Sequence, residues 1–283
     1  KSKLKKKKKN QKKNNLKNSK TKKNGLIVSD NKNLIIDRDI YIITVPTPVD
    51  KDKNPDLYSI IEATKLTSKF LSKKNIVIYE STFYPGLTEE ICIPLLEKES
   101  KLKINKDFYV GYSPERINIG KEEKLSHDLI KITSGSNKTA SKIIDTLYKS
   151  VMKSGTYCVE SIKIAEATKM LENCQRDLNI ALMNELSKFF KKINVDTKKV
   201  IKAASTKWNF AEYYPGLVGG DCIAVDPYYI IHSAKKFKHN LPLVSLAREI
   251  NEEMTDYIFG EILKKTEQST IQKLAFFGIS YKE

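Results

Sequence analysis

Two periods of apolar and polar residues alternate along this chain, and each change of period marks a new element. Short apolar runs typical of buried strands occupy residues 39–46, 75–82, 107–113, 128–135 and 156–161. Segments with apolar residues at helical spacing occupy residues 56–72, 87–98 and 138–152. Strands that alternate with helices predict βαβ units and a parallel sheet covered by helices on both faces.

Helical periodicity takes over after residue 161. Residues 156–214 contain neither glycine nor proline, and the pattern predicts one continuous helix over 162–192. Its apolar positions include Ile164, Leu171, Leu178, Leu182, Leu186 and Phe189. This helix is too long for a crossover between strands, so we expect it to connect domains or to form a dimer. Further helices are predicted over residues 195–205, 226–237 and 242–265.

These elements predict an α/β fold with an incomplete Rossmann-like parallel sheet domain over residues 25–161. A helical central domain, suited to dimerisation, follows over 162–268. KLAFFGIS (273–280) is predicted to be the first strand of a second α/β domain that occupies 269–283. The sequence contains no G-x-G, the glycine-rich turn with which a dinucleotide-binding domain normally opens. We therefore expect the chain to be the middle part of a larger protein.

The net charge of +17 comes mainly from a lysine-rich tail, residues 1–24. Residues 1–23 contain 13 lysines and no acidic residue, which leaves +4 for the remaining 260 residues. Such a run cannot bury apolar surface, so it predicts a disordered tail. Contact of the tail with RNA, DNA or acidic lipid is the alternative, but the weakly charged body argues against a nucleic-acid-binding protein.

The remaining composition argues against several other classes. No apolar run reaches the roughly 18 residues of a membrane span, and no secretory signal is recognisable. The four cysteines form no C-x-x-C pair and the three histidines are scattered, so no metal site is predicted. We expect reduced thiols and a cytoplasmic location.

One cysteine lies in an unusual place, in the loop GLVGGDCIAVDPYY (216–229). Asp226 is a favoured helix N-cap and Pro227 a favoured first helical residue, so Cys222 lies four residues before a predicted helix. The positive end of a helix favours a thiolate nearby. The alternative is that Cys222 is a small apolar filler and Asp226 only a cap.

A second candidate group lies on the long helix. Lys169, Asn173 and Arg176 are spaced i, i+4 and i+7, so they share one side of the helix. An ammonium, an amide and a guanidinium form a donor array suited to an oxyanion or a phosphate. The alternative is a solvated, charged face, although asparagine in mid-helix suggests that its amide is used.

Six segments in order carry a resemblance to a known family: VPTPVD (45–50), YESTFYPGLTEE (79–90), GYSPERIN (111–118), IAEATKMLENCQRDLNIALMNEL (164–186), TKWNF (206–210) and PGLVGGDCIAVDPYY (215–229). From about residue 30 onward the chain resembles the UDP-glucose/GDP-mannose dehydrogenase family. It is most similar to the branch that oxidises UDP-N-acetylhexosamines for bacterial surface polysaccharides, the Vi-antigen type.

The resemblance implies a four-electron oxidation of a sugar C6 alcohol to a carboxylate, with two NAD molecules used in turn. Cys222 would capture the C6 aldehyde as a thiohemiacetal, and loss of a second hydride would give a thioester that water hydrolyses. Lys169 and Asn173 would donate to the developing alkoxide at C6. Asp226 and Thr82 would orient the water.

The resemblance also implies the rest of the site. Glu115 would assist as a base, and the NAD site would be lined by Pro46, Thr47 and Thr82. Contacts to the UDP-sugar would come from Arg116, Ile117, Lys169, Asn173, Arg176, Trp208, Asn209, Gly219 and Arg248. For Arg248 a surface helix charge is the alternative. The expected partners are the UDP-sugar and a second copy of the chain, bound through the central helices.

Some residues depart from the family pattern and leave alternatives open. Asp221 precedes the cysteine where this branch usually has histidine. The UDP-glucose branch usually has a lysine before the aspartate, where this chain has Val225. The alternatives are therefore a UDP-glucose 6-dehydrogenase, or a truncated and inactive remnant that only dimerises. We expect the chain as given to be inactive or nearly so.

Overall fold

The computed structural model describes residues 26–116, 129–220, 222–267, 273 and 275. By its contacts the chain divides into a unit of residues 1–39 and a unit of residues 40–283. The described part of the first unit holds a short 3₁₀ helix, Lys32–Ile35, capped by the Asn31 side chain. The lysine-rich tail and the strand predicted over 273–280 lie outside the described residues, apart from two positions of the strand.

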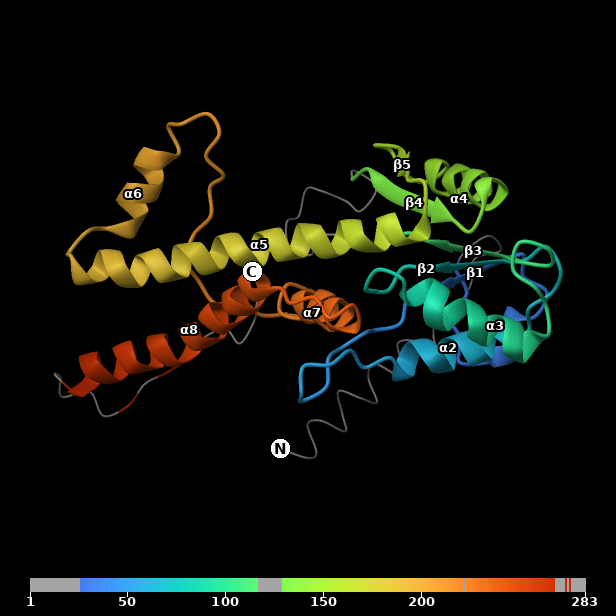
Figure 1. Cartoon of the computed structure of the whole chain (residues 1–283), viewed down its shortest axis with the longest axis horizontal. Coiled ribbons are helices and arrows are strands. Elements are labelled where there is room, and N and C mark those ends of the chain that lie inside the picture. The colour runs from blue at the N-terminus through green and yellow to red at the C-terminus, as the bar shows by residue number, and fades with distance from the viewer. Residues whose placement is uncertain (1–25, 117–128, 221, 268–272, 274, 276–283) are drawn as a thin grey trace. The chain divides into compact units, whose positions relative to one another are not determined.

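The second unit begins with a sheet of five strands in the order β1-β2-β3-β4-β5 (Figure 1). The strands are β1 (Ile40–Ile43), β2 (Ile76–Tyr79), β3 (Tyr109–Tyr112), β4 (Lys131–Gly135) and β5 (Thr156–Cys158). Neighbouring strands run parallel except for β3 and β4, which are antiparallel. The predicted α/β class with a mainly parallel sheet is therefore confirmed.

The antiparallel direction of β4 corrects the prediction of a wholly parallel sheet. All five residues of β4 are buried, and a fully buried strand has the same pattern in either direction, so the sequence could not reveal its direction. Gly111 of β3 allows the close approach that the pairing needs. A Cβ atom there would lie 2.6 Å from the Ser134 carbonyl oxygen and 2.2 Å from the Ile144 side chain.

Helices cover both faces of the sheet, as predicted. They are α2 (Tyr58–Ser68), α3 (Ile93–Ser100), which continues a π-helix over Thr88–Cys92, and α4 (Lys138–Lys149). On one face Ile144 and Tyr148 of α4 pack against Ile78 of β2. On the other face the Tyr79 hydroxyl group of β2 is hydrogen-bonded to Thr64 of α2. All four residues of β2 are buried, as expected for a central parallel strand.

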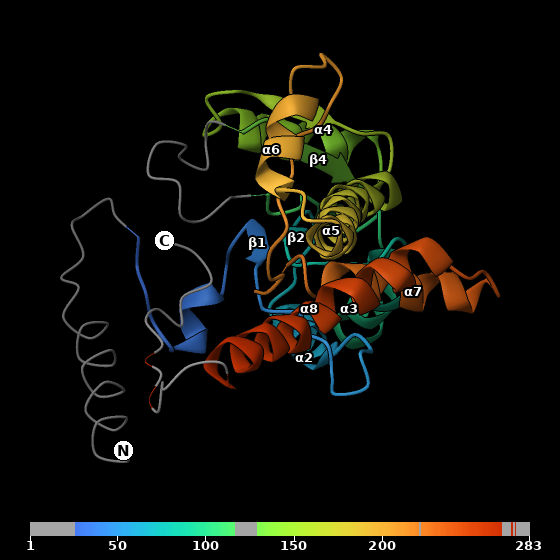
Figure 2. The same ribbon diagram turned by 90° about the vertical axis from the view of Figure 1, so that its left-hand side faces the viewer.

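The helical region consists of α5 (Ile162–Lys192), α6 (Thr197–Ala204), α7 (Asp226–Lys236) and α8 (Pro242–Glu267). The predicted continuous helix over 162–192 is confirmed to the residue, and its start is capped by the Ser161 side chain. Helices α7 and α8 both contact α5. Figure 2 shows α5 almost along its axis, with α8 beside it.

Helix α5 is unusual because much of its buried side is polar. The buried polar residues are Glu166, Lys169, Asn173, Asp177 and Asn184. Of the apolar positions noted in the sequence, four are exposed: Ile164 (43%), Leu171 (69%), Leu182 (47%) and Phe189 (53%). Buried polar groups need hydrogen-bond partners, so the partners of these residues show how α5 is attached to the rest of the protein.

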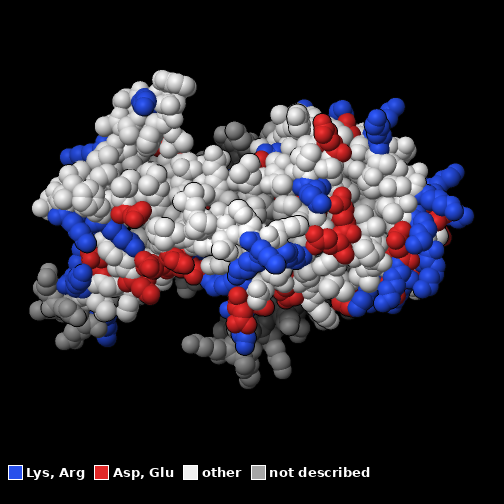
Figure 3. Space-filling model, in the orientation of Figure 1, with Lys and Arg blue, Asp and Glu red and all other residues white. Residues whose placement is uncertain are grey.

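The surface of the described residues carries charges of both signs. On the face shown in Figure 3, acidic side chains lie among the lysines and arginines. This agrees with the weak net charge of the body after the lysine-rich tail. In the described ranges, no helix is both long and apolar enough to cross a membrane.

Candidate functional site

A cavity of about 390 Å³ opens beyond the carboxyl ends of β1, β2 and β3. Five residues with predicted roles line it: Pro46, Thr47, Thr82, Glu115 and Lys169. The first four follow the strands, and Lys169 comes from α5. Ligands of open α/β sheets bind at the carboxyl ends of the strands, so the structure brings these side chains together at the expected place.

Asp226, at the start of α7, joins this group from the protein interior. Its side chain is fully buried and accepts a hydrogen bond from the Asn173 amide. Burial raises the pKa of Asp226 to about 6, although the Lys169 charge, the Asn173 amide and the Thr82 hydroxyl act in the opposite direction. Its Oδ1 atom has no hydrogen-bond partner among the described residues. A carboxyl with this pKa can exchange a proton near neutral pH.

The prediction that Asp226 caps a helix is wrong. Helix α7 begins at Asp226 itself, and the residue at the cap position, Val225, makes no side-chain cap bond. The backbone N–H groups of both residues instead donate to the Cys222 carbonyl, at 3.0 and 2.8 Å. The Asp226 side chain is therefore available to Asn173. Pro227 does occupy the first turn, as predicted.

Cys222 is exposed and lies four residues before α7, as the sequence indicated. The alternative of a buried apolar filler is therefore wrong. Cys222 is not among the residues that line the 390 Å³ cavity. Its carbonyl is held by the first turn of α7, whose Asp226 contacts Asn173. The convergence of the thiol on Lys169 and Asn173 stays a prediction, and Asp221 lies outside the described residues.

Arg116 is engaged by the protein itself. Its guanidinium forms a two-pronged ion pair with Glu172 of α5 and donates to the Ile130 carbonyl at 2.9 Å. Arg116 thus ties the segment after β3 to the long helix. Its predicted contact with a sugar nucleotide would require sharing or exchanging these partners. Ile117, the next predicted contact, lies outside the described residues.

Four other predicted substrate contacts are exposed and do not line the cavity. They are Arg176, Trp208, Asn209 and Gly219. Trp208 is 93% exposed, and a Cβ at Gly219 would meet no atom within 4 Å. Arg176 lies on the same side of α5 as Lys169 but is not buried with it. The structure therefore does not join these residues to the group around Lys169.

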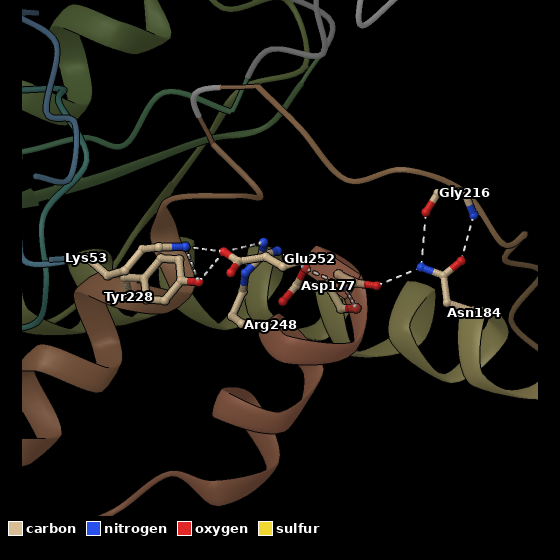
Figure 4. A network of polar contacts seen from close by, with 8 residues as sticks. Lys53, Asp177, Asn184, Gly216, Tyr228, Arg248 and Glu252 are labelled. Carbon is tan, nitrogen blue, oxygen red and sulfur yellow. Dashed lines mark hydrogen bonds and ion pairs between the residues drawn. The ribbon is translucent and has the colours of Figure 1, made fainter. Parts of the chain in front are cut away.

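Arg248 is buried, so its interpretation as a surface charge is wrong. The side chain is 4% exposed, and its guanidinium lies 2.6 Å from Asp177 of α5 and 3.5 Å from Glu252. Glu252 in turn contacts Lys53 and the Tyr228 hydroxyl (Figure 4). Burial raises the pKa of Asp177, and the nearby Arg248 acts against that rise. This buried ion pair joins α8 to α5.

The same network reaches the segment that leads to the cysteine loop. The Asn251 amide donates to Asp177 at 2.7 Å, and Asn251 accepts from Asn184 at 2.8 Å. The Asn184 side chain pairs with both the carbonyl and the N–H of Gly216, at 3.0 and 2.8 Å (Figure 4). Gly216 lies six residues before Cys222. Its backbone N–H and carbonyl are thus paired with an amide side chain, in the way that a neighbouring backbone would pair with them.

The sequence analysis missed Glu166, which lies one helical turn before Lys169. It is fully buried and accepts from the Gly86 N–H at 2.6 Å, the Thr88 N–H at 3.0 Å and the Thr88 hydroxyl at 2.7 Å. Burial raises its pKa to about 7. Glu166 fixes the turn after Thr82 to α5. A carboxylate three residues before the candidate Lys169, on the same side of a predicted helix, was the signal available.

No group of three or more histidine, cysteine, aspartate or glutamate side chains suited to a metal ion occurs in the described part of the chain. The donors of the cavity are instead hydroxyl, carboxyl and ammonium groups. Such a set fits an organic ligand with polar oxygens, because it includes both hydrogen-bond donors and acceptors.

Two family models match most of the chain. The NAD binding domain of the UDP-glucose/GDP-mannose dehydrogenase family matches residues 4–152, and the central domain of the same family matches residues 163–253. The chain belongs to the UDP-glucose/GDP-mannose dehydrogenase family. This family of dehydrogenases uses NAD, and the match assigns that cofactor to the sheet domain. The Thr47 and Thr82 hydroxyls at the strand ends fit such a ligand.

Three other dehydrogenases are similar to this chain over most of its length. It is 46% identical to the UDP-N-acetyl-D-glucosamine 6-dehydrogenase of Pseudomonas aeruginosa, over 86% of the chain and 59% of the relative. With the enzyme of the same name from Salmonella typhi it is 45% identical, over 86% of the chain and 58% of the relative. The solved UDP-D-ManNAc dehydrogenase of Pyrococcus horikoshii superposes with a TM-score of 0.80 at 32% identity, over 87% of this chain and 57% of that one. The chain thus spans less than two thirds of these relatives.

Proposed function

We propose that this chain carries the reaction centre of an NAD-dependent oxidation that converts the C6 alcohol of a UDP-N-acetylhexosamine to a carboxylate. The observation that carries the proposal is the single cavity lined by Thr47, Thr82, Glu115 and Lys169, which come from four separate segments. Two relatives that cover most of the chain are named UDP-N-acetyl-D-glucosamine 6-dehydrogenases. A reducing cytoplasm would keep the required thiol.

The segment after β1 would hold the cofactor. Bound NAD supplies a hydride acceptor. Pro46 and Thr47 lie in the segment that follows β1, and Thr82 lies three residues after β2. The Tyr229 hydroxyl of α7 donates to the Pro48 carbonyl at 3.2 Å, so the helix that follows the cysteine loop also holds this segment. The segment that would hold NAD and the helix that follows the cysteine loop are thus joined directly.

Lys169 and Asn173 would act on the alcohol in the first oxidation. Asn173 gives one amide hydrogen to Asp226 and has a second one for the C6 oxygen. Lys169 is 5% exposed, and a cation in such a dry site stabilises a developing alkoxide strongly. Asp226, with a pKa of about 6, and Glu115 can accept the alcohol proton or orient water.

Cys222 would act in the second oxidation. Its sulfur adds to the aldehyde carbon, and the aldehyde oxygen takes a proton, which gives a thiohemiacetal. Loss of a hydride and of the hydroxyl proton would then give the thioester, with a second bound NAD as the hydride acceptor. Water then breaks the carbon–sulfur bond, which releases the acid and restores the thiol. Substrate contacts from Arg116, Ile117, Arg176, Trp208, Asn209, Gly219 and Arg248 belong to the same proposal.

The choice of sugar can be tested with a hybrid in which this chain replaces the matching part of the P. aeruginosa relative. We expect faster oxidation of UDP-N-acetylglucosamine or UDP-N-acetylgalactosamine than of UDP-glucose, with two NADH formed per sugar. The expectation rests on the names of the relatives and on Val225, where the UDP-glucose branch has lysine. Faster turnover of UDP-glucose would refute the assignment, and no turnover of any sugar would leave the remnant interpretation.

We also propose that two copies of the chain associate through α5. The observation behind this is its exposed apolar row, Ile164, Leu171, Leu182 and Phe189. Water-exposed apolar side chains in a row on one helix favour burial against a partner. Sedimentation equilibrium of the chain should give twice the mass of 32.3 kDa, and Leu171→Glu should shift it toward the monomer. Glu62→Lys, a charge reversal at an exposed position of α2, is the control; a monomeric parent chain would contradict the proposal.

A further inference from the structure

The antiparallel strand β4 brings a lysine to the edge of the cavity. Gly111 and Tyr112 of β3 pair with Gly135 and Ser134 of β4. The same register, continued past the end of β3, sets Lys131 opposite Glu115. Lys131 is the first residue of β4, so a parallel β4 would have placed it at the opposite end of the sheet.

Lys131 is buried and surrounded by acceptors. Its side chain is 9% exposed, and its Nζ atom lies 3.2 Å from a Glu80 carboxyl oxygen and 3.8 Å from a Glu115 carboxyl oxygen. It also donates to the Pro114 carbonyl at 3.2 Å and lies 5.2 Å from the centre of the Tyr148 ring. One ammonium group therefore holds the carboxyl and the preceding carbonyl of the segment that carries Glu115.

Glu80 and Glu115 are neighbours on the cavity wall. Both line the 390 Å³ cavity, and the Glu115 N–H donates to the Glu80 carbonyl at 3.3 Å. The Tyr148 hydroxyl also donates to the Glu80 carboxyl. Two carboxylates so placed repel each other unless a cation lies between them, and Lys131 occupies that position.

We propose that Lys131 is a positioning residue for Glu115, and that it does so by bridging the Glu115 and Glu80 carboxylates from β4. The role rests on the proposed function, in which Glu115 serves the sugar oxidation. Removal of Lys131 takes the counter-charge from Glu80, whose side chain is 15% exposed, and from Glu115, whose side chain is 44% exposed. The remaining repulsion should move Glu115 away from the cavity, where a shift of about 1 Å can cost around a hundredfold in rate.

Second-site rescue tests the bridge. The variants are Lys131→Met, Glu80→Gln and the double variant, and Lys149→Met is the control because Lys149 is an exposed lysine on α4. Urea unfolding is measured on the full 283-residue chain, and NADH formation is measured on the hybrid described above. We expect Lys131→Met to lower kcat by about tenfold to a hundredfold with a smaller change in KM. The double variant should regain at least part of kcat and of the unfolding midpoint, because one of the two repelling charges is gone.

Each outcome decides a different point. A Lys131→Met hybrid with unchanged kcat, or a double variant that shows the simple product of the two single losses, would overturn the positioning role. If Lys131→Met alone does not fold, the double variant still tests the positioning role, because it lacks the repelling pair of carboxylates. A hybrid without substitutions that forms no NADH overturns the proposed function and the positioning role with it. In that case, a higher unfolding midpoint in the double variant than in Lys131→Met shows only that Lys131 bridges the two carboxylates.

Discussion

Replacement of Cys222 by serine is expected to abolish formation of the uronic acid. Under the proposed function, only a thiolate can add to the aldehyde and later leave from the acyl carbon; a serine hydroxyl is far less acidic and leaves poorly. The rate of acid formation should fall by about a thousandfold or more. The first oxidation does not need the sulfur, so residual chemistry should stop at a bound aldehyde.

The measurement is the number of NADH formed per sugar in the hybrid, together with chromatography of the sugar product. The hybrid should give two NADH per sugar, and the Cys222→Ser variant one at most. Cys158→Ser is a matched control, because Cys158 is exposed like Cys222 but lies on β5. Acid formation at the parent rate in the Cys222→Ser variant would remove this cysteine from the mechanism.

Glu166 should make the stability of the chain depend on pH. Burial is the largest cause that raises its pKa from 4.5 to about 7, and hydrogen bonds from Thr88 and Gly86 act in the opposite direction. Because the folded-state pKa lies above the unfolded one, the folded chain binds more protons in this range. The stability that Glu166 contributes is therefore present below about pH 4.5 and is lost as the pH rises through about 7.

Urea unfolding of the chain and of a Glu166→Gln variant at pH 5 and pH 8 isolates this contribution. The stability of the parent minus that of the variant should fall by roughly 2–3 kcal/mol between the two pH values. Asp226, whose pKa is also raised, is present in both proteins and cancels. Glu62→Gln, which removes an exposed carboxylate on α2, is the control. A difference that stays constant or grows with pH would contradict the assignment.

The local features of the sequence were enough to predict most elements. The absence of glycine and proline over residues 156–214 and the apolar period predicted α5 with its observed ends. The strand–helix alternation predicted a covered sheet, and the ends of its strands carry Thr47, Thr82 and Glu115 in one cavity. The predicted elements are confirmed because the apolar period and the absence of helix breakers depend on neighbouring residues along the chain.

The roles of single polar residues were harder to predict. Aspartate is a favoured residue at helix N-caps, yet the carboxyl of Asp226 is buried and accepts a hydrogen bond from Asn173. For Arg248 the sequence left open a contact with the UDP-sugar or a surface helix charge, yet it pairs with Asp177 more than 70 positions away, by a bond of 2.6 Å. A buried polar side chain takes the partner that the packing brings to it, and that partner leaves no mark at the position itself.

The sequence by itself determined the class of the fold and the bounds of the long helix. Only the tertiary structure decided the direction of β4, and with it the place of Lys131 beside Glu115 and Glu80. It also decided that the inner side of α5 is polar, with Glu166 holding the turn after Thr82. The physical reason is that a short, fully buried strand can pair in either direction with the same side chains buried, so its direction is set by the neighbours that it finds in the folded chain.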